Sequence, residues 1–365
     1  MLRGVAMLRR LMRAGRVLGA YGVLPPPEWE KFAPPQASLL RFLFPKSKAE
    51  MSGRSGERLA RALTKLGPSY IKMGQFIATR PDVIGAEIAR DLSELQDRLP
   101  PFPHDEAMRV LREELDPERI AALGDIGEAV AAASIAQVHK VALKTADAKP
   151  QLRALKILRP GVEQTFAEEL EAFAWGARMA ERFGGEEMRR MKPSAGVETL
   201  ARSVVIEMDL RLEAAAAAEM ATNTRNDPDF RVPAVDWDLT TRRVLATEWI
   251  DATPLKDIDA LRAQGHDLKR LATTVIQSFL RHALRDGFFH ADMHPGNLFL
   301  DDAGRLVAVD FGIMGRLGPK EKRFLAEILL GFITRDYRRV AEVHFEAGYV
   351  PAHHSVENFA QAIRA

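Results

Sequence analysis

Residues 290–297 read His-Ala-Asp-Met-His-Pro-Gly-Asn, and one predicted hairpin later the chain reads Asp310-Phe311-Gly312. Phosphoryl transfer needs one carboxylate that orients the nucleophile, and an amide and a second carboxylate that bind metal ions on the phosphates. These two stretches supply that set. They predict that Asp292 orients the attacking group and that Asn297 and Asp310 hold Mg²⁺, which prefers oxygen ligands.

The spacing of these residues resembles the H-R-D-x-x-x-x-N and D-F-G motifs of protein kinases, with Ala291 in place of the arginine. A polar loop in front of a turn is the alternative, and D-F-G alone would not exclude it. His290, Asp292 and Asn297 all fall at the spacing of the kinase motif, and a strand is predicted between the two motifs. Together these features favour a catalytic loop.

The composition is that of an ordinary globular protein. The chain has 365 residues, of which 47% are hydrophobic and 28% charged, and this length suits two or three domains. A net charge of +2 indicates no nucleic-acid partner, and the lack of cysteine excludes disulfides and thiolate metal sites. No apolar run is long enough to predict a transmembrane helix.

The N-terminus predicts an amphipathic helix with arginines on one face and apolar side chains on the other. Residues 1–27 contain no acidic residue. This pattern predicts a helix that lies on an anionic membrane surface; a helix docked on the protein's own core is the alternative. The two faces comprise Arg3, Arg9, Arg10, Arg13 and Arg16, and Val5, Leu8, Leu11, Met12 and Leu18.

Proline clusters and changes in periodicity predict an α+β protein, a kinase-like two-lobed fold with a helical N-terminal extension. The expected segments are an amphipathic helix and linker (1–45), a helical extension (46–125), an N-lobe (126–250) and a C-lobe (251–365). Helices are expected over residues 57–79, 83–97, 163–183, 196–222 and 267–286, and strands over 137–143, 151–158, 232–237 and 242–250.

Lys156 lies on a predicted strand where a kinase lysine would contact the α- and β-phosphates; a solvent-facing lysine is the alternative. The preceding loop, residues 131–136, is rich in alanine where kinases carry glycine. Alanine disfavours positive φ, so a stiffer loop is expected, with Ala132, Ala133 and Ser134 near the nucleotide. The alternative is a helix N-terminus, which would also bind phosphate.

Two acidic residues, Glu207 and Asp209, fall within a predicted helix and cannot share a face of it. One of them is expected to pair with Lys156; Glu207 is favoured over Asp209, and a solvated acidic pair is the alternative. Residues 247–251 resemble a kinase hinge, so backbone groups near Glu248 and Ile250 are expected to meet adenine.

Lys72-Met73-Gly74-Gln75 is not a kinase motif. Lys72 and Gln75 share one helical face, which by itself predicts an exposed polar surface. A glycine inside a helix costs about 1 kcal/mol relative to alanine, so Gly74 indicates close packing.

Taken together, the sequence resembles the UbiB family of atypical kinase-like proteins of ubiquinone biosynthesis. The resemblance implies an ATP-binding, Mg²⁺-dependent fold with ATPase activity. It implies that the Lys72–Gln75 helix lies over the active site and that Lys72, Gln75 and Asp209 are regulatory. It rests on Lys72-x-Gly74-Gln75, residues 131–139, Lys156, Glu207-x-Asp209, residues 290–297 and Asp310-Phe311-Gly312.

The family also implies membrane association, on the cytoplasmic side of the bacterial inner membrane, with quinone precursors and other ubiquinone-biosynthesis proteins as partners. Members commonly end in transmembrane helices, so such helices are expected after Ala365. The expected function is a kinase-like ATPase that supports ubiquinone biosynthesis. A non-catalytic nucleotide-binding adaptor is the alternative. A protein kinase acting in trans is disfavoured by the alanine loop, the Lys72–Gln75 helix and the short region after Gly312.

Overall fold

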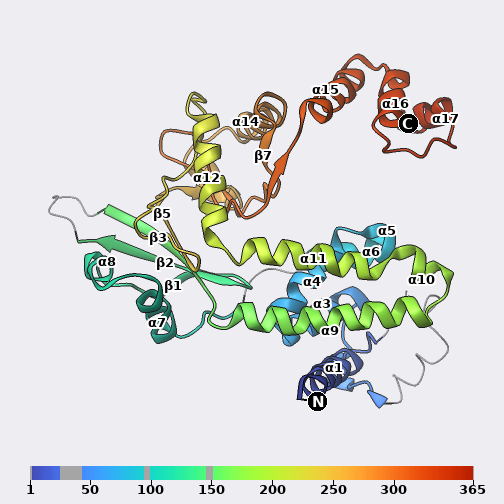
Figure 1. Cartoon of the computed structure of the whole chain (residues 1–365). Coiled ribbons are helices and arrows are strands. Elements are labelled where there is room, and N and C mark those ends of the chain that lie inside the picture. The colour runs from blue at the N-terminus through green and yellow to red at the C-terminus, as the bar shows by residue number, and fades with distance from the viewer. Residues whose placement is uncertain (1, 25–42, 94–98, 145–150, 365) are drawn as a thin grey trace. The chain divides into compact units, whose positions relative to one another are not determined.

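The computed structural model describes residues 2–24, 43–93, 99–144 and 151–364. They form two compact units (Figure 1). The first unit comprises Met1–Leu210 and Trp237–Ala246, and the second comprises Arg211–Asp236 and Thr247–Ala365. The segment boundaries expected at residues 45, 125 and 250 remain predictions.

The first unit combines a helical extension with a sheet. Its helices are α1 Leu2–Ala20, α3 Ser55–Leu66, α4 Pro68–Ala78, α5 Pro81–Ile84, α6 Ala86–Ser93, α7 His104–Glu114, α8 Pro117–Ala122, α9 Val162–Phe183, α10 Glu186–Met191 and α11 Pro193–Glu207, with a 3-10 turn, η2, at Lys48–Glu50. Its strands are β1 Ala129–Ala132, β2 Ala136–Leu143, β3 Gln151–Leu158 and β5 Val244–Glu248, which runs on into the second unit.

The second unit carries short strands among longer helices. The helices are α12 Leu210–Thr224, α13 Ile258–Ala263, α14 Leu268–Arg281, α15 Pro319–Thr334, α16 Tyr337–Glu346 and α17 Val356–Arg364, with a π-helical turn, η3, at His282–Asp286. The strands are β4 Phe230–Arg231, β6 Thr253–Pro254, β7 Phe288–His290, β8 Leu298–Leu300, β9 Leu306–Ala308 and β10 Met314–Arg316.

Two sheets carry the residues of interest. In the first unit the strand order is β1-β2-β3-β5, and β2 pairs antiparallel with β3 so that Lys156 lies opposite Val138. In the second unit the order is β4-β9-β8-β6, and β8 and β9 form an antiparallel hairpin in which Leu298 lies opposite Ala308. The residues just beyond this pair, Asn297 and Val309, are therefore neighbours at the open end of the hairpin.

The helical extension has its own apolar core, formed by buried side chains of α1, α3, α4 and α6. Tyr70 of α4 packs edge-on against Phe173 of α9, with ring centroids 4.9 Å apart. Burial raises the pKa of Tyr70 to about 12, as expected for a phenol removed from water. The extension is thereby attached to α9 by aromatic packing.

The first helix docks on this core, so the predicted separation of an arginine face from an apolar face is wrong. Ala14 is buried and Leu18 packs against the core cluster. Arg10 turns inward and forms an ion pair with Glu168 of α9. Helical periodicity cannot predict the ion pair between Arg10 and Glu168, because Glu168 lies far away in the sequence.

Part of α1 nevertheless stays exposed. Val5, Leu8 and Met12 are 56%, 60% and 39% exposed, on the same side of the helix as the exposed Arg9 and Arg16. This edge mixes apolar and basic side chains instead of separating them onto two faces.

Several predicted elements are divided. The helix expected over 196–222 is broken after Glu207 and resumes at Leu210, so Asp209 lies between two helices rather than inside one. The helix expected over 57–79 breaks at Gly67, which has a φ of 113°. The strand expected over 232–237 is reduced to an isolated bridge at Val235.

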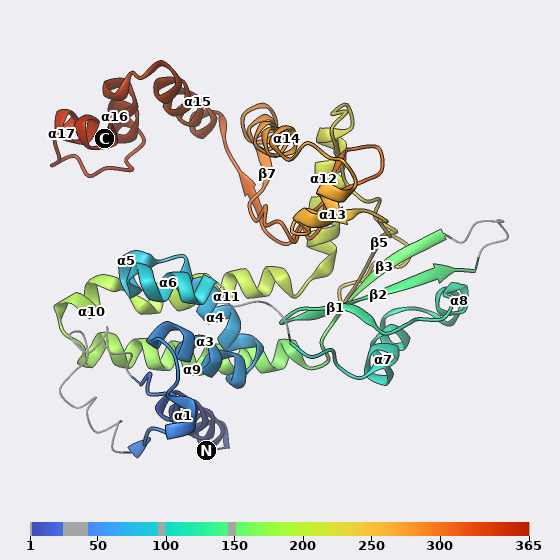
Figure 2. The same cartoon turned by 180° about the vertical axis from the view of Figure 1, so that it is seen from behind.

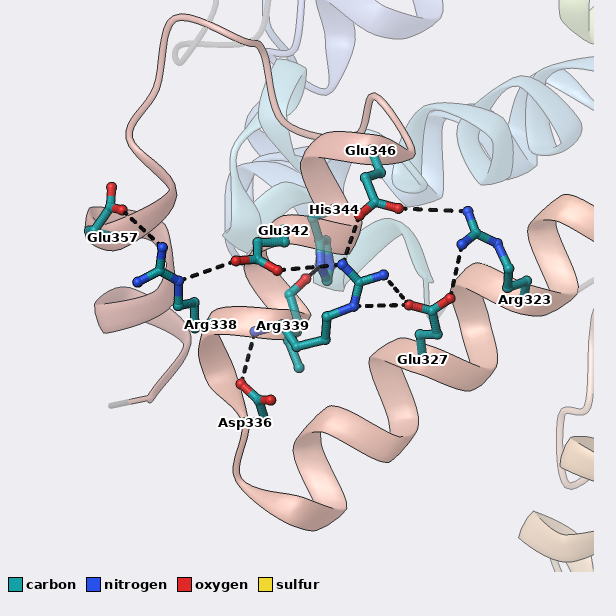
Figure 3. Close-up of polar contacts among 10 residues, drawn as sticks. Arg323, Glu327, Asp336, Arg338, Arg339, Glu342, His344, Glu346 and Glu357 are labelled. Carbon is teal, nitrogen blue, oxygen red and sulfur yellow. Dashed lines mark hydrogen bonds and ion pairs between the residues drawn. The ribbon is translucent and has the colours of Figure 1, made fainter.

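Ion pairs join the three C-terminal helices (Figure 3). The Arg339 guanidinium contacts Glu327 of α15 and lies 2.7 Å from Glu346 of its own helix, α16. Arg323 of α15 reaches the same two carboxylates at 3.1 and 3.6 Å. Single exposed pairs contribute little, but shared carboxylates form a network that fixes α15 against α16.

Among the described residues, no helix is both long and apolar enough to cross a bilayer.

A buried polar chain fixes the start of β2. Gln137 donates to the Phe102 carbonyl (3.3 Å) and accepts from the Phe102 N–H (2.9 Å). Its amide nitrogen also lies 2.8 Å from His139 Nε2, while His139 Nδ1 lies 2.7 Å from the Gly127 carbonyl. Nδ1 therefore donates and Nε2 accepts, which is the neutral tautomer. Burial lowers the pKa of His139 accordingly.

This arrangement predicts acid sensitivity. An unfolded histidine titrates near about 6.5, and the folded His139 titrates lower, so the unfolded state binds more protons as the pH falls. Stability is then greatest above the unfolded pKa and declines as the pH falls below it. We expect His139→Gln to flatten the decline of the melting temperature between pH 7 and 5. An unchanged slope would show that His139 is not among the groups responsible.

Candidate functional site

The catalytic-loop motif is held by local hydrogen bonds in the second unit. His290 is buried at the end of β7, and its Nε2 lies 3.1 Å from the Val309 carbonyl. Its Nδ1 accepts from the Asp292 N–H at 3.1 Å. One imidazole ring thus joins the loop that carries Asp292 to the residue immediately before Asp310.

Asn297 and Asp292 contact each other directly. The Asn297 amide nitrogen donates to the Asp292 carboxylate at 3.1 Å and to the Asp292 carbonyl at 3.2 Å. With its NH₂ group directed at Asp292, Asn297 has its amide oxygen to offer a cation. The Val309 N–H donates to the Asn297 carbonyl at 2.9 Å, so Asp310 follows directly after a residue tied to Asn297.

Asp310 has a left-handed backbone, with a φ of 61°. This conformation is uncommon for any residue except glycine and persists where its surroundings enforce it, frequently at functional sites. The next residue, Phe311, is buried in the core of the unit, and its ring lies 5.5 Å from that of His290. Packing of Phe311 therefore fixes the strained turn while Asp310 itself stays exposed.

These side chains fit Mg²⁺ bound together with phosphate rather than a cation held by protein alone. No cluster of three or more His, Asp or Glu suited to a metal occurs in the described part of the chain. Mg²⁺ usually takes one or two protein carboxylates and completes its shell with water and substrate phosphates. Asn297 and Asp310 supply one amide oxygen and one carboxylate, which matches that pattern.

The first unit holds the predicted phosphate-binding residues. Lys156 is half-buried on β3, and the alanine-rich loop is a tight turn between β1 and β2 in which the Ala133 N–H donates to the Ala136 carbonyl at 2.7 Å. The alternative of a helix N-terminus is therefore wrong. No residue from 131 to 136 has a positive φ, as expected for alanine, and Ser134 is buried.

Arg159 braces this turn, and the sequence analysis did not find it. Its guanidinium donates to the Ala133 carbonyl at 3.1 Å and to the Pro100 carbonyl at 2.8 Å, and its own N–H donates to the Ile135 carbonyl at 2.8 Å. The sequence signal that could have pointed to Arg159 is the Arg-Pro-Gly of residues 159–161, which ends the strand that carries Lys156. The turn is thus stiffened by hydrogen bonds as well as by its alanines.

Glu207 has a different partner from the one expected. Its carboxylate lies 2.7 Å from Lys72 Nζ and also accepts from the Ser203 hydroxyl at 3.1 Å. The side chains of Lys72 and Glu207 are only 15% and 10% exposed. The expected pair of Glu207 with Lys156 remains a prediction, whereas the interpretation of Lys72 as part of an exposed polar face is wrong.

The remaining predicted residues are Gln75, Asp209, Glu248 and Ile250. Gln75 shares α4 with Lys72, and Asp209 lies between α11 and α12. Glu248 ends β5; its backbone N–H donates to the Ala234 carbonyl, and its side chain forms an ion pair with Arg231. Ile250 follows where the strand has ended. The adenine contacts expected of Glu248 and Ile250 remain predictions.

Comparison with known proteins identifies the family. Residues 94–344 match the ABC1 atypical kinase-like domain. The chain belongs to the ABC1 family of atypical kinase-like proteins, and its similar curated relatives are named UbiB. The resemblance inferred from the motifs is thereby confirmed, as is the kinase-like α+β fold.

Two relatives show how far the similarity extends. The "Probable protein kinase UbiB" of Marinobacter nauticus is 37% identical over 88% of this chain and 58% of that protein. The protein of the same name from Pseudomonas aeruginosa is 38% identical over 98% of this chain and 68% of that protein. The chain thus spans between 58% and 68% of the length of these two relatives.

A solved structure supports the fold alone. The complex of Rv3197 with erythromycin from Mycobacterium tuberculosis superposes with a TM-score of 0.57 at 24% identity, over 80% of this chain and 72% of that one.

The buried pair of Lys72 and Glu207 predicts a coupled effect on stability. Removing one partner leaves an uncompensated charge, so Lys72→Met and Glu207→Gln should each lower the free energy of unfolding by about 3 kcal/mol. The double variant should recover most of that loss, since neither charge remains. Urea denaturation measures all four proteins. Additive losses would show that the two side chains do not depend on each other.

The hydrogen bonds of Arg159 to the alanine turn predict that its substitution loosens this turn locally. Arg159→Gln should raise amide hydrogen exchange of the Ala133 N–H, which closes the turn, while the helices keep their protection. Arg153→Gln, the same change near the start of β3, is the matched control. Equal exchange at Ala133 in both variants would show that the arginine does not stabilise the turn.

Proposed function

We propose that the protein is a kinase-like ATPase that uses Mg-ATP. The observation that carries the proposal is the hydrogen-bonded set of Asp292 and Asn297, with Asp310 strained at the same end of the β8–β9 hairpin. Phe311, which is buried in the core, holds the exposed Asp310 in this left-handed conformation, a kind of strain that is frequent at functional sites.

Each residue has a role that its chemistry suits. Asn297 and Asp310 would hold Mg²⁺, which when bound would neutralise charge on the phosphates. Asp292 would orient the attacking hydroxyl or water, and its contact with Asn297 keeps its carboxylate in one position. Lys156 would bind phosphate oxygens as a point charge, and the stiff turn at Ala132, Ala133 and Ser134 would limit how the nucleotide enters.

We further propose that this activity supports ubiquinone biosynthesis at the cytoplasmic side of the bacterial inner membrane. The similar relatives carry the name UbiB. The exposed edge of α1 adds a physical reason, because Val5, Leu8 and Met12 beside Arg9 and Arg16 suit an anionic bilayer surface. Quinone precursors and other proteins of that biosynthesis would be met there.

A non-catalytic nucleotide-binding adaptor is the second candidate, and one observation favours it. The Glu207 carboxylate is engaged by Lys72, and this contact competes with the ion pair between a strand lysine and a helix glutamate that kinase activity requires. The same observation weighs against a protein kinase acting in trans. Regulation through Lys72, Gln75 and Asp209 would then act by releasing Glu207.

Two substitutions separate the ATPase from the adaptor. Asp310→Asn should weaken Mg-ATP binding by about tenfold or more, because a charged ligand is lost from a hard cation. Asp292→Asn should change affinity by no more than about threefold and reduce phosphate release by about a hundredfold. Calorimetry and phosphate release measure the two effects.

The exposed Asp302, in the turn of the same hairpin, provides the control as Asp302→Asn. Binding without phosphate release in the unaltered protein would favour the adaptor. Failure of the unaltered protein to bind Mg-ATP would refute both functions.

The membrane proposal has its own test. Changing Val5, Leu8 and Met12 to serine should reduce sedimentation with phosphatidylglycerol vesicles severalfold, since these side chains are exposed and their loss should not unfold the protein. Ile258→Ser with Tyr349→Ser removes exposed apolar groups elsewhere and should have no effect. Equal sedimentation of all three proteins would leave α1 with a purely structural role.

A further inference from the structure

The short helix α10 joins the two long helices α9 and α11 (Figures 1 and 2). A basic pocket is lined by residues of this connection and of the end of α9. Gly184 ends α9, and Lys192 separates α10 from α11 in a left-handed conformation with a φ of 48°. These two turns fold the connection back on itself. The pocket has a volume of about 440 Å³ and is lined by Arg178, Glu181, Arg182, Arg189 and Lys192.

The positive charge of this pocket is not neutralised by ion pairs with residues whose side chains the structure describes. None of the four cations forms an ion pair with a described residue, whereas the adjacent Arg190 pairs with Glu186 at 2.6 Å. The single carboxylate, Glu181, is already engaged: it accepts from the Ser194 N–H at 2.9 Å and from the Ser194 hydroxyl at 2.8 Å. Glu181 thus fixes the first turn of α11 and leaves the cations available to a ligand.

We propose that this pocket binds the phosphate group of an anionic ligand. Arg178 and Arg182 are one turn apart on α9, so both guanidinium groups can reach one anion from the same face. A guanidinium donates two parallel hydrogen bonds to phosphate oxygens, and a lysine adds a compact third charge. Four cations that line one hollow around a single, already engaged carboxylate suit a phosphate group, whose oxygens can accept from more than one of them, better than a carboxylate ligand.

The surroundings indicate what the phosphate is attached to. Trp175 lies on the same face of α9 as Arg178 and Arg182 and is 38% exposed, and Phe183 at the end of the helix is 62% exposed. Exposed aromatic rings beside arginines are typical of surfaces at the headgroup level of a bilayer. The phosphate of a lipid headgroup therefore fits the whole patch, while a free phosphate would use the cations alone.

This pocket shares no residue with the proposed nucleotide site. None of its lining residues belongs to the catalytic loop, the alanine turn or the Lys72–Glu207 pair. Its test can therefore succeed or fail whatever the outcome for Mg-ATP.

The test compares two double variants that lose the same charge. Arg178→Gln with Arg182→Gln removes two cations from the pocket. Arg190→Gln with Arg202→Gln removes two exposed arginines of α10 and α11 that do not line it. Both keep α1 intact. Titration with inorganic phosphate, and sedimentation with phosphatidylcholine vesicles that contain or lack phosphatidylglycerol, are measured on the full chain, with thermal unfolding as the check on folding.

We expect the pocket variant to bind anionic vesicles up to about thirtyfold more weakly than the unaltered chain, and the control variant to bind much less weakly than that. Loss of phosphate binding together with vesicle binding would identify the headgroup phosphate as the ligand. Loss of phosphate binding alone would identify a soluble phosphate compound. Equal losses in both variants, no loss in the pocket variant, or no binding of either probe by the unaltered chain would each overturn the proposal.

Discussion

The ion pair between Lys72 and Glu207 is the contact that organises the first unit. It joins α4, from the helical extension, to the C-terminal end of α11, and both side chains are largely buried. Removing either side chain would leave the charge of the other one unpaired in a low-dielectric environment. The helix that carries Lys72 and Gln75 is therefore an integral part of the first unit.

The catalytic loop depends on a different kind of contact. His290, Asp292 and Asn297 hold one another through short-range hydrogen bonds, and the β8–β9 hairpin returns the chain to Asp310. Such a site is specified almost entirely by about twenty consecutive residues. The alanine turn of the first unit relies instead on contacts between segments that are distant in sequence, such as Pro100 with Arg159.

This difference explains what the sequence could predict. Local spacing was sufficient to single out the stretch in which Asp292 and Asn297 are in contact, and to give the strand of Lys156 its bounds at residues 151–158. It was insufficient wherever a partner came from elsewhere: Glu207 with Lys72, Arg10 with Glu168, and Arg159 with the alanine turn. Helix breaks at Gly67 and after Glu207 were missed because apolar periodicity continues across both positions.

The chain passes between the two units three times, after residues 210, 236 and 246. Neither unit is consequently a continuous segment of the gene. A recombination event at a single point could not transfer one lobe intact, because β5 begins in one unit and ends in the other. The two lobes are therefore expected to be inherited together. Insertions and domain fusions are best tolerated at the ends of the chain and in surface turns such as the one at Asp302.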